Sequence, residues 1–111
     1  MNDPLDLAFA AMADPTRRAI LVRLAQGQAN VSELAEPFAI SQPAISKHLK
    51  VLEDAGLVRV VHEGRSRPRR LDQKGFERAG DFIGQMAQYW PGQFDRLASF
   101  LEQTNKSESP E

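Results

Sequence analysis

The sequence contains no cysteine, only two histidines, and a single tryptophan and tyrosine among its 111 residues. Without cysteine the chain can form neither a disulfide nor a thiolate metal site, a composition compatible with a reducing compartment. Neither His48 nor His62 has the partners of a catalytic base, and no glycine-rich phosphate loop is present. We therefore expect no enzymatic activity, no catalytic residue and no cofactor.

Long apolar runs are also missing from the sequence. No stretch approaches the roughly 18 residues of a membrane span, and the segment 1–4 lacks the basic start and apolar centre of a signal peptide. We expect a cytoplasmic protein with no membrane partner. With 41% hydrophobic residues, the chain is long enough for one small domain, placed at residues 1–103, and the polar residues 104–111 are predicted to be a disordered tail.

The chain has no overall excess of positive charge. Its formal net charge is −1, which taken alone argues weakly against nucleic-acid binding. The charge is unevenly distributed, however, because residues 41–80 carry nine Lys/Arg and only five Asp/Glu. Positive charge concentrated in one segment is typical of a surface that binds phosphates.

Residues 41–56, SQPAISKHLKVLEDAG, have the pattern of an amphipathic helix. Ser41 is a suitable N-cap and Gly56 a suitable stop after the last turn. Apolar residues recur at i, i+4 and i+7 and predict one buried stripe, formed by Ile45, Leu49 and Leu52. The opposite face is polar, as in a helix that enters a major groove, although an ordinary helix with a solvated outer face has the same pattern.

The polar face supplies two sets of candidate DNA contacts. Amide, hydroxyl and ammonium groups in its first turns can bond base edges, and we assign base recognition to Gln42, Ser46 and Lys47. Contacts to the DNA backbone are assigned to Ser41, His48 and Lys50. For His48, packing against a neighbouring element is an equally good interpretation.

The segments on either side of this helix predict a helix-turn-helix followed by a hairpin. Upstream, residues 30–38 are predicted to form a short helix that begins with a capping box. Pro37 lies late in this helix, where it removes a backbone hydrogen bond and should shorten the last turn. A tight link then joins the helix to Ser41. Downstream, residues 57–62 and 67–71 read as two strands around turn residues, and Pro68 favours an edge position for the second. Guanidinium groups of this hairpin are predicted to hold the DNA backbone, namely those of Arg65, Arg67 and Arg69.

Four segments in this order resemble the ArsR family of bacterial winged-helix regulators. They are the stretches ADPTRRAIL at 13–21, VSELA at 31–35 and SQPAISKHL at 41–49, and the Gly64-Arg65 hairpin. The resemblance covers residues 7–102 and implies a mainly α-helical winged helix-turn-helix with helix order α1-α2-α3-α4-β-β-α5. It also implies a homodimer that binds a double-stranded DNA operator and usually represses transcription.

The two ends of the chain are predicted to form the dimer interface. A first helix over 5–12 carries spaced apolar residues, and a second helix, capped by Asp14, places Ile20, Leu21 and Leu24 in the core. After Asp72, a long helix repeats apolar residues every seven positions, a pattern typical of a seam between helices, with Pro91 kinking or splitting it. The residues assigned to the interface are Leu5, Phe9, Ile83, Met86, Trp90 and Leu97.

We therefore predict a homodimeric, autoregulating repressor that binds a palindromic operator in double-stranded DNA. Two alternatives stay open: a winged helix that binds an acidic protein partner, and a metal-responsive repressor with an unrecognised site. Many members of the resembled family sense metals through cysteines in the helix that corresponds to 31–38 or through Asp/His ligands on the last helix. This chain has no cysteine, and its last helix has no histidine, so we predict no metal site. No feature of the sequence identifies an effector.

Overall fold

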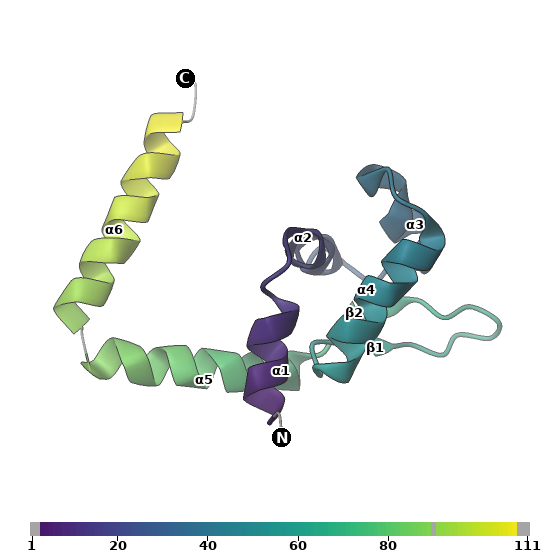
Figure 1. The fold of residues 1–111 in the computed structure, drawn as a ribbon, viewed down its shortest axis with the longest axis horizontal. Coiled ribbons are helices and arrows are strands. Elements are labelled where there is room, and N and C mark those ends of the chain that lie inside the picture. The colour runs from purple at the N-terminus through teal and green to yellow at the C-terminus, as the bar shows by residue number, and fades with distance from the viewer. Residues whose placement is uncertain (1–2, 90, 109–111) are drawn as a thin grey trace. The chain divides into compact units, whose positions relative to one another are not determined.

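The structure is a computed structural model that describes residues 3–89 and 91–108. The chain divides into two compact units between Ala79 and Gly80. Figure 1 shows the order of elements, which is α1 (Pro4–Ala11), α2 (Pro15–Leu24), α3 (Val31–Ala35), the 3-10 helix η1 (Glu36–Phe38), α4 (Gln42–Asp54), β1 (Val58–Val60), β2 (Arg69–Leu71), α5 (Gln73–Tyr89) and α6 (Pro91–Glu108). The predicted fold class, mainly helical with a hairpin, is confirmed. The helix order is the predicted one, with the last helix divided in two.

Side-chain caps begin the helices of the first unit where the sequence predicts them. The Asp14 carboxylate accepts the Arg17 backbone N–H at 3.0 Å. Asn30 and Glu33 form the predicted capping box at the start of α3. The Ser41 hydroxyl accepts the Ala44 backbone N–H at 3.3 Å. These caps satisfy N–H groups that a helix leaves without internal partners, so they fix where each helix begins.

The core of the first unit forms around α4. Its predicted stripe of Ile45, Leu49 and Leu52 is fully buried. The other large side chains that are fully buried come from α2, α3 and the residue before β1, namely Ile20, Leu34 and Leu57. Burial of each such side chain contributes about 1.5–3 kcal/mol, so α4 is held firmly by its inner face while its outer face stays exposed.

Two prolines end helices as predicted. The α-helix α3 ends at Ala35, and the residues around Pro37 form the 3-10 turn η1. Ala39 then adopts a left-handed backbone conformation with φ of 55°, which turns the chain into α4. At the other end, α5 stops at Tyr89 and Pro91 opens α6, so the long C-terminal helix is split in two, since proline cannot continue a helix but fits its first turn.

The first helix buries its small side chains in the core of this unit. Ala8 and Ala11 are buried, with Leu7 and Met12 partly buried against the core. Phe9 is 37% exposed. Small side chains of α1 therefore face the core with Leu7 beside them, and Phe9 is left at the surface. The assignment of Leu5 and Phe9 to a dimer interface stays a prediction.

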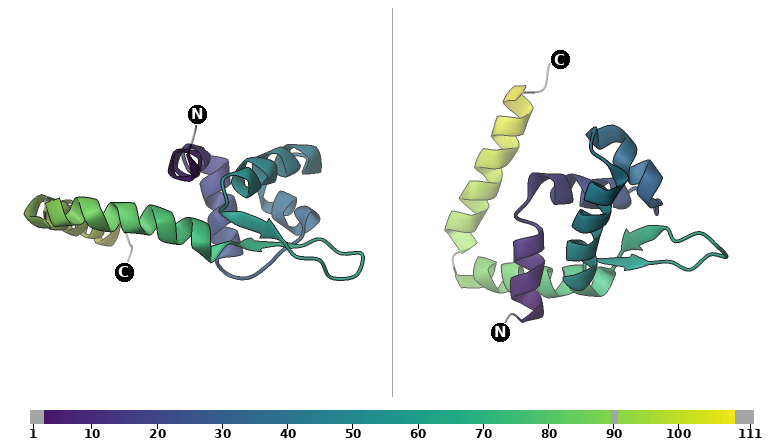
Figure 2. Two further views of the ribbon diagram at one scale, coloured as in Figure 1. Left: turned by 90° about the horizontal axis from the view of Figure 1, so that it is seen from below. Right: turned by 45° about the vertical axis from the view of Figure 1, so that its right-hand side comes forward.

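The hairpin is a two-stranded antiparallel sheet in which Val58 pairs with Leu71 and Val60 with Arg69. Its strands are shorter than predicted, and β2 begins directly after Pro68, which cannot donate to the ladder. The outer side of β2 is not a fully open edge, because Ala29 and Arg69 exchange both backbone hydrogen bonds, at 2.7 and 3.1 Å. Beyond the strands the hairpin projects away from α3 and α4 in both views of Figure 2.

In the second unit, α5 and α6 carry large apolar side chains at their surface. Ile83 is 42% exposed and Leu97 56% exposed. Trp90, assigned to the dimer interface, lies outside the described residues. The chain is helical to Glu108, past the point where the tail is predicted to begin, and the disorder of that tail stays a prediction. None of the described helices is long and apolar enough to cross a membrane.

Candidate nucleic-acid interface

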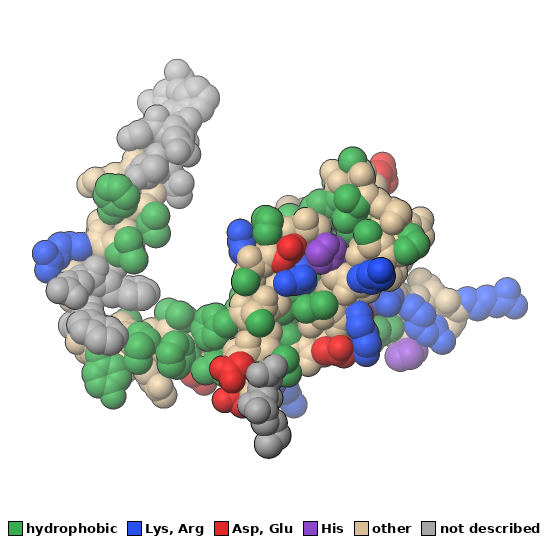
Figure 3. All heavy atoms as spheres, viewed as in Figure 1, with side chains coloured by type: hydrophobic (Ala, Val, Ile, Leu, Met, Phe, Trp, Pro, Cys, Tyr) green, Lys and Arg blue, Asp and Glu red, His purple; other side chains and the backbone are tan. Residues whose placement is uncertain are grey.

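The outer face of α4 presents the three residues assigned to base recognition. Gln42, Ser46 and Lys47 are all exposed. Gln42 and Ser46, four residues apart, are neighbours on the helix surface, and Lys47 follows Ser46 at the edge of the same exposed face. We call these three residues the recognition face. In Figure 3, Lys and Arg side chains lie over α4 and along the projecting hairpin. The recognition face thus presents exposed donors and acceptors of the kinds that can bond base edges, and its role in base recognition stays a prediction.

The residues that flank the recognition face already have partners within the chain. The Ser41 hydroxyl is the N-cap of α4, and the Lys50 ammonium lies 2.9 Å from the Asp54 carboxylate. This hydrogen bond to Asp54 raises the pKa of Lys50. Both side chains of the pair are more than half exposed, so the pair is weak and Lys50 can exchange its partner for a phosphate.

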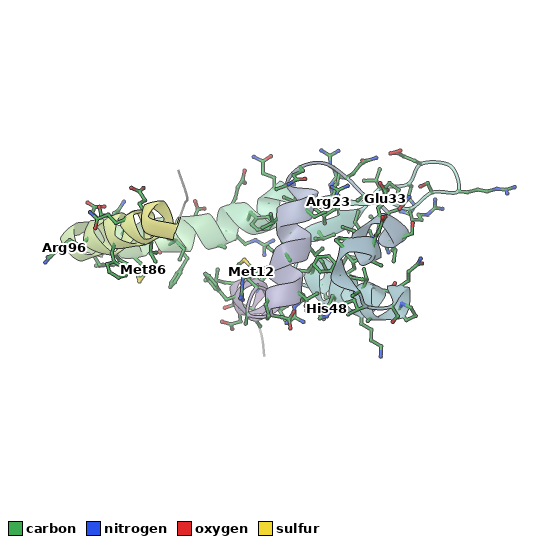
Figure 4. All side chains as sticks on the ribbon, turned by 90° about the horizontal axis from the view of Figure 1, so that it is seen from above. Met12, Arg23, Glu33, His48, Met86 and Arg96 are labelled. Atoms are coloured by element: carbon green, nitrogen blue, oxygen red, sulfur yellow. The ribbon has the colours of Figure 1, made fainter. Side chains whose placement is uncertain are left out.

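His48 packs against the junction of α1 and α2. Its Nδ1 lies 3.4 Å from the Arg17 guanidinium and 3.9 Å from the Asp14 carboxylate, and Figure 4 shows the ring between α4 and this junction. The Arg17 backbone N–H donates to Asp14 and lowers the pKa of that carboxyl. Of the two interpretations of His48, the structure shows the neighbour-packing one, and its contact with DNA stays a prediction.

Two arginines of α2 hold the C-terminus of α1. Arg17 donates from Nε to the Ala11 carbonyl at 2.7 Å, and Arg18 donates from Nη1 to the Met12 carbonyl at 2.9 Å. Cations at a helix C-terminus satisfy carbonyls that have no internal partner. These contacts give Arg17 and Arg18 a structural role. The sequence could not show which carbonyls they bind.

The hairpin from Val58 to Leu71, which we call the wing, presents two of its three assigned arginines at the surface. Arg65 is exposed at the tip. Arg67 is also exposed, and one terminal nitrogen of its guanidinium donates to the carbonyls of Gly64 and Ser66 at 2.7 and 2.8 Å. Arg67 therefore shapes the turn through Nη1.

Arg69 differs from the other two wing arginines. Its Nε lies 3.0 Å from Oε2 of Glu53, and the two side chains are only 18% and 23% exposed. Its Nη1 also donates to the Arg67 carbonyl. The sequence contains no sign of the Glu53 partner, because the two residues are 16 positions apart. The assignment of Arg69 to the DNA backbone stays a prediction, now beside a structural role.

The basic residues of segment 41–80 do not share one surface. Arg59 and Arg70 lie directly opposite each other across the wing, on its exposed side, and line a cavity of about 560 Å³ with Lys74. The count of charges along the sequence therefore overstates the number that can reach one DNA surface together with α4.

Among the described residues, no group of three or more His, Asp or Glu is arranged to hold a metal ion.

This geometry defines a winged helix-turn-helix, with α3 and α4 as the two helices and the β1-β2 hairpin as the wing. The comparisons agree, since residues 14–60 match the model of bacterial regulatory proteins of the arsR family. A crystal structure of an ArsR family transcriptional regulator superposes with a TM-score of 0.73 at 39% identity, covering 81% of this chain and 99% of that one. The chain therefore belongs to the ArsR family, as its sequence motifs indicate.

Three further similarities bear on function. The HTH-type transcriptional regulator Rv2034 of Mycobacterium tuberculosis is 50% identical over 70 residues, which cover 63% of this chain. The solution structure of Mb0332 from Mycobacterium bovis, described as a homodimeric winged helix-turn-helix DNA-binding domain, has a TM-score of 0.63 at 26% identity over 79% of this chain and 82% of that one. The transcriptional repressor SdpR of Bacillus subtilis is 46% identical over 50 residues, which cover 45% of this chain. The chain spans only 65% of the length of Rv2034 and 56% of the length of SdpR.

Proposed function

We propose that the protein is a DNA-binding transcriptional regulator that acts as a homodimer on a palindromic operator, most simply its own, and represses transcription there. The observation that carries this proposal is the exposed recognition face of α4 beside the projecting basic wing. A helix of this kind reads bases while a wing of this kind holds the backbone. The name of the relative SdpR and the homodimeric state of the Mb0332 domain support repression and dimerisation by similarity.

The proposed geometry constrains the operator. A two-fold dimer would present two copies of α4 to successive major grooves, so we expect half-sites about 34 Å apart, one turn of the double helix. Selection of preferred duplexes from a random pool would identify the operator. Salt-dependent binding to the selected duplex is the primary test, and failure to bind any duplex at low ionic strength would favour the alternative of an acidic protein partner.

Base recognition is tested by Gln42→Ala. We expect this variant to lose discrimination at one base pair of each half-site, by about tenfold to hundredfold, because a bidentate amide contact contributes about 1–3 kcal/mol of discrimination. Affinities for single-base operator variants, measured by fluorescence anisotropy, provide the readout. Gln26→Ala is the matched control, since Gln26 is an exposed glutamine after α2. Unchanged preference in Gln42→Ala would remove Gln42 from the recognition face.

Backbone binding is tested by replacing Arg65 and Arg67 together with alanine. Phosphate contacts carry no sequence information, so affinity for operator and random duplex should fall by the same factor. The slope of log affinity against log salt should become shallower by about 0.9 for each lost contact. Lysine at both positions is the control, because it keeps the charge. A loss confined to the operator would show that the wing reads bases.

A further inference from the structure

The pair formed by Glu53 and Arg69 joins the two parts of the proposed DNA surface. Glu53 is the next-to-last residue of α4, and Arg69 is the first residue of β2. The distance of 3.0 Å from Nε to Oε2 and the low exposure of both side chains distinguish this pair from the exposed pair of Lys50 and Asp54 on the same helix. Water screens a partly buried pair less, and removal of one partner leaves an uncompensated charge.

The backbone at Arg69 is held from a second side. Arg69 exchanges two backbone hydrogen bonds with Ala29, which is 1% exposed. Near the wing tip, Nε2 of Gln28 donates to Oε1 of Glu63 at 2.6 Å. The loop between α2 and α3 therefore supports the outer side of β2, while the Glu53 carboxylate links the same residue to α4. Arg69 is the point where the wing, this loop and α4 meet.

We propose that Glu53 and Arg69 are positioning residues, and that Arg69 acts on DNA binding by fixing the wing against α4, with no contact of its own to phosphate. This inference rests on the proposed function. The distance between the recognition face and the wing tip must match the distance between a major groove and the adjacent backbone. A wing held in place before binding loses less conformational freedom on binding than a loose one.

The two roles of Arg69 predict opposite effects of Glu53→Gln. If Arg69 binds phosphate directly, Glu53 competes for its guanidinium and repels DNA, so neutralising Glu53 tightens binding. If the pair positions the wing, the same substitution removes a repulsive charge and still weakens binding, because the wing loses its link to α4. The sign of the change in affinity therefore separates the two roles.

The experiment compares Glu53→Gln, Arg69→Gln and the double variant on the selected operator. We expect each single variant to bind the operator about threefold to tenfold more weakly than the wild type. The double variant should bind no more weakly than the weaker of the two single variants, because both substitutions break the same interaction. The salt slope of Arg69→Gln should stay that of the wild type. Asp54→Asn is the matched control, because it neutralises the adjacent acid of α4 and should leave affinity unchanged or slightly raised.

Three outcomes of this comparison would overturn the proposal. They are tighter binding by Glu53→Gln, additive losses in the double variant, and a salt slope for Arg69→Gln that is shallower by about 0.9. Because the single variants could unfold, the exchanged pair Glu53→Arg with Arg69→Glu provides a second test. A folded exchanged variant should recover most of the lost affinity, and its failure to do so would contradict the proposal.

Amide hydrogen exchange tests the positioning role without DNA. The Val61 backbone N–H donates to the Pro68 carbonyl at 2.8 Å, just beyond the paired strands. In Glu53→Gln this amide should exchange faster than in Asp54→Asn, and equal rates would overturn the proposal. If the wild-type protein binds no duplex, the proposed function fails, while the exchange measurement still decides whether Glu53 holds the wing.

Discussion

Gly75→Ala should destabilise the protein by about 3 kcal/mol or more, the upper part of the range for overpacking a closed interior site. Gly75 is buried in the first turn of α5. A Cβ at this position would overlap the Gly56 carbonyl oxygen, lie 2.7 Å from the carbonyl carbon and press on the Leu57 side chain at 3.3 Å. Neither neighbour can move easily, because Gly56 has a φ of +77° at the end of α4 and Leu57 is fully buried.

The expected loss exceeds what helix propensity would gain. Alanine in place of glycine within a helix is ordinarily stabilising by about 0.5–1 kcal/mol. Gly80→Ala is the matched control, because Gly80 lies in the same helix and, apart from its chain neighbours and the backbone of its own helix, no atom of the described residues is within 4 Å of the added Cβ. Urea unfolding followed by circular dichroism should give Gly75→Ala a lower free energy of unfolding than the wild type and Gly80→Ala a higher one. Equal stabilities for Gly75→Ala and Gly80→Ala would contradict the close approach of α5 to the end of α4.

Ile83→Glu should convert the proposed dimer into a monomer and lower operator affinity by about two orders of magnitude or more. Ile83 is 42% exposed on α5, in the heptad pattern that predicts a helix seam. A carboxylate there would be buried without a partner on association. The loss at the operator is large because a dimer binds its second half-site as an intramolecular event, which adds a factor of about 10²–10⁴.

Light scattering measures whether the variant is a monomer. Affinities for the full operator and for an isolated half-site measure the loss in DNA binding. The isolated half-site should be bound equally by the variant and the wild-type subunit, since the recognition face is unchanged. Gln85→Glu is the control, because Gln85 is exposed on the same helix, two residues away and so on nearly the opposite side. A folded Ile83→Glu variant that stays dimeric would remove Ile83 from the interface, and the same approach applies to Leu5, Phe9, Met86 and Leu97.

The elements that could be predicted from the sequence are those whose determining interactions are local. Caps at Asp14 and Ser41 act within three residues, the stripe from Ile45 to Leu52 lies within one helix, and Pro91 acts on its own turn. Each of these signals is contained in a short window, so the helix boundaries and the buried face of α4 could be predicted.

The features that sequence analysis missed depend on tertiary packing. No short window contains both Glu53 and Arg69, and nothing in the pattern around Gly75 indicates that Gly56 lies against it. For the same reason, all wing arginines looked equivalent as phosphate ligands. Their different partners depend on how β2 packs against α4, and the pattern of the sequence contains no sign of that packing.

The projecting wing tip, in a chain without cysteine, also makes the protein convenient to label. Ser66 is exposed beside Arg65, and because the sequence has no cysteine, Ser66→Cys would introduce a unique reactive thiol while leaving both tip arginines in place. A fluorophore or nitroxide attached there would report wing mobility in solution and its immobilisation by a duplex. In a two-fold assembly the same label would provide one pair of probes, whose separation measures the spacing of the two wings.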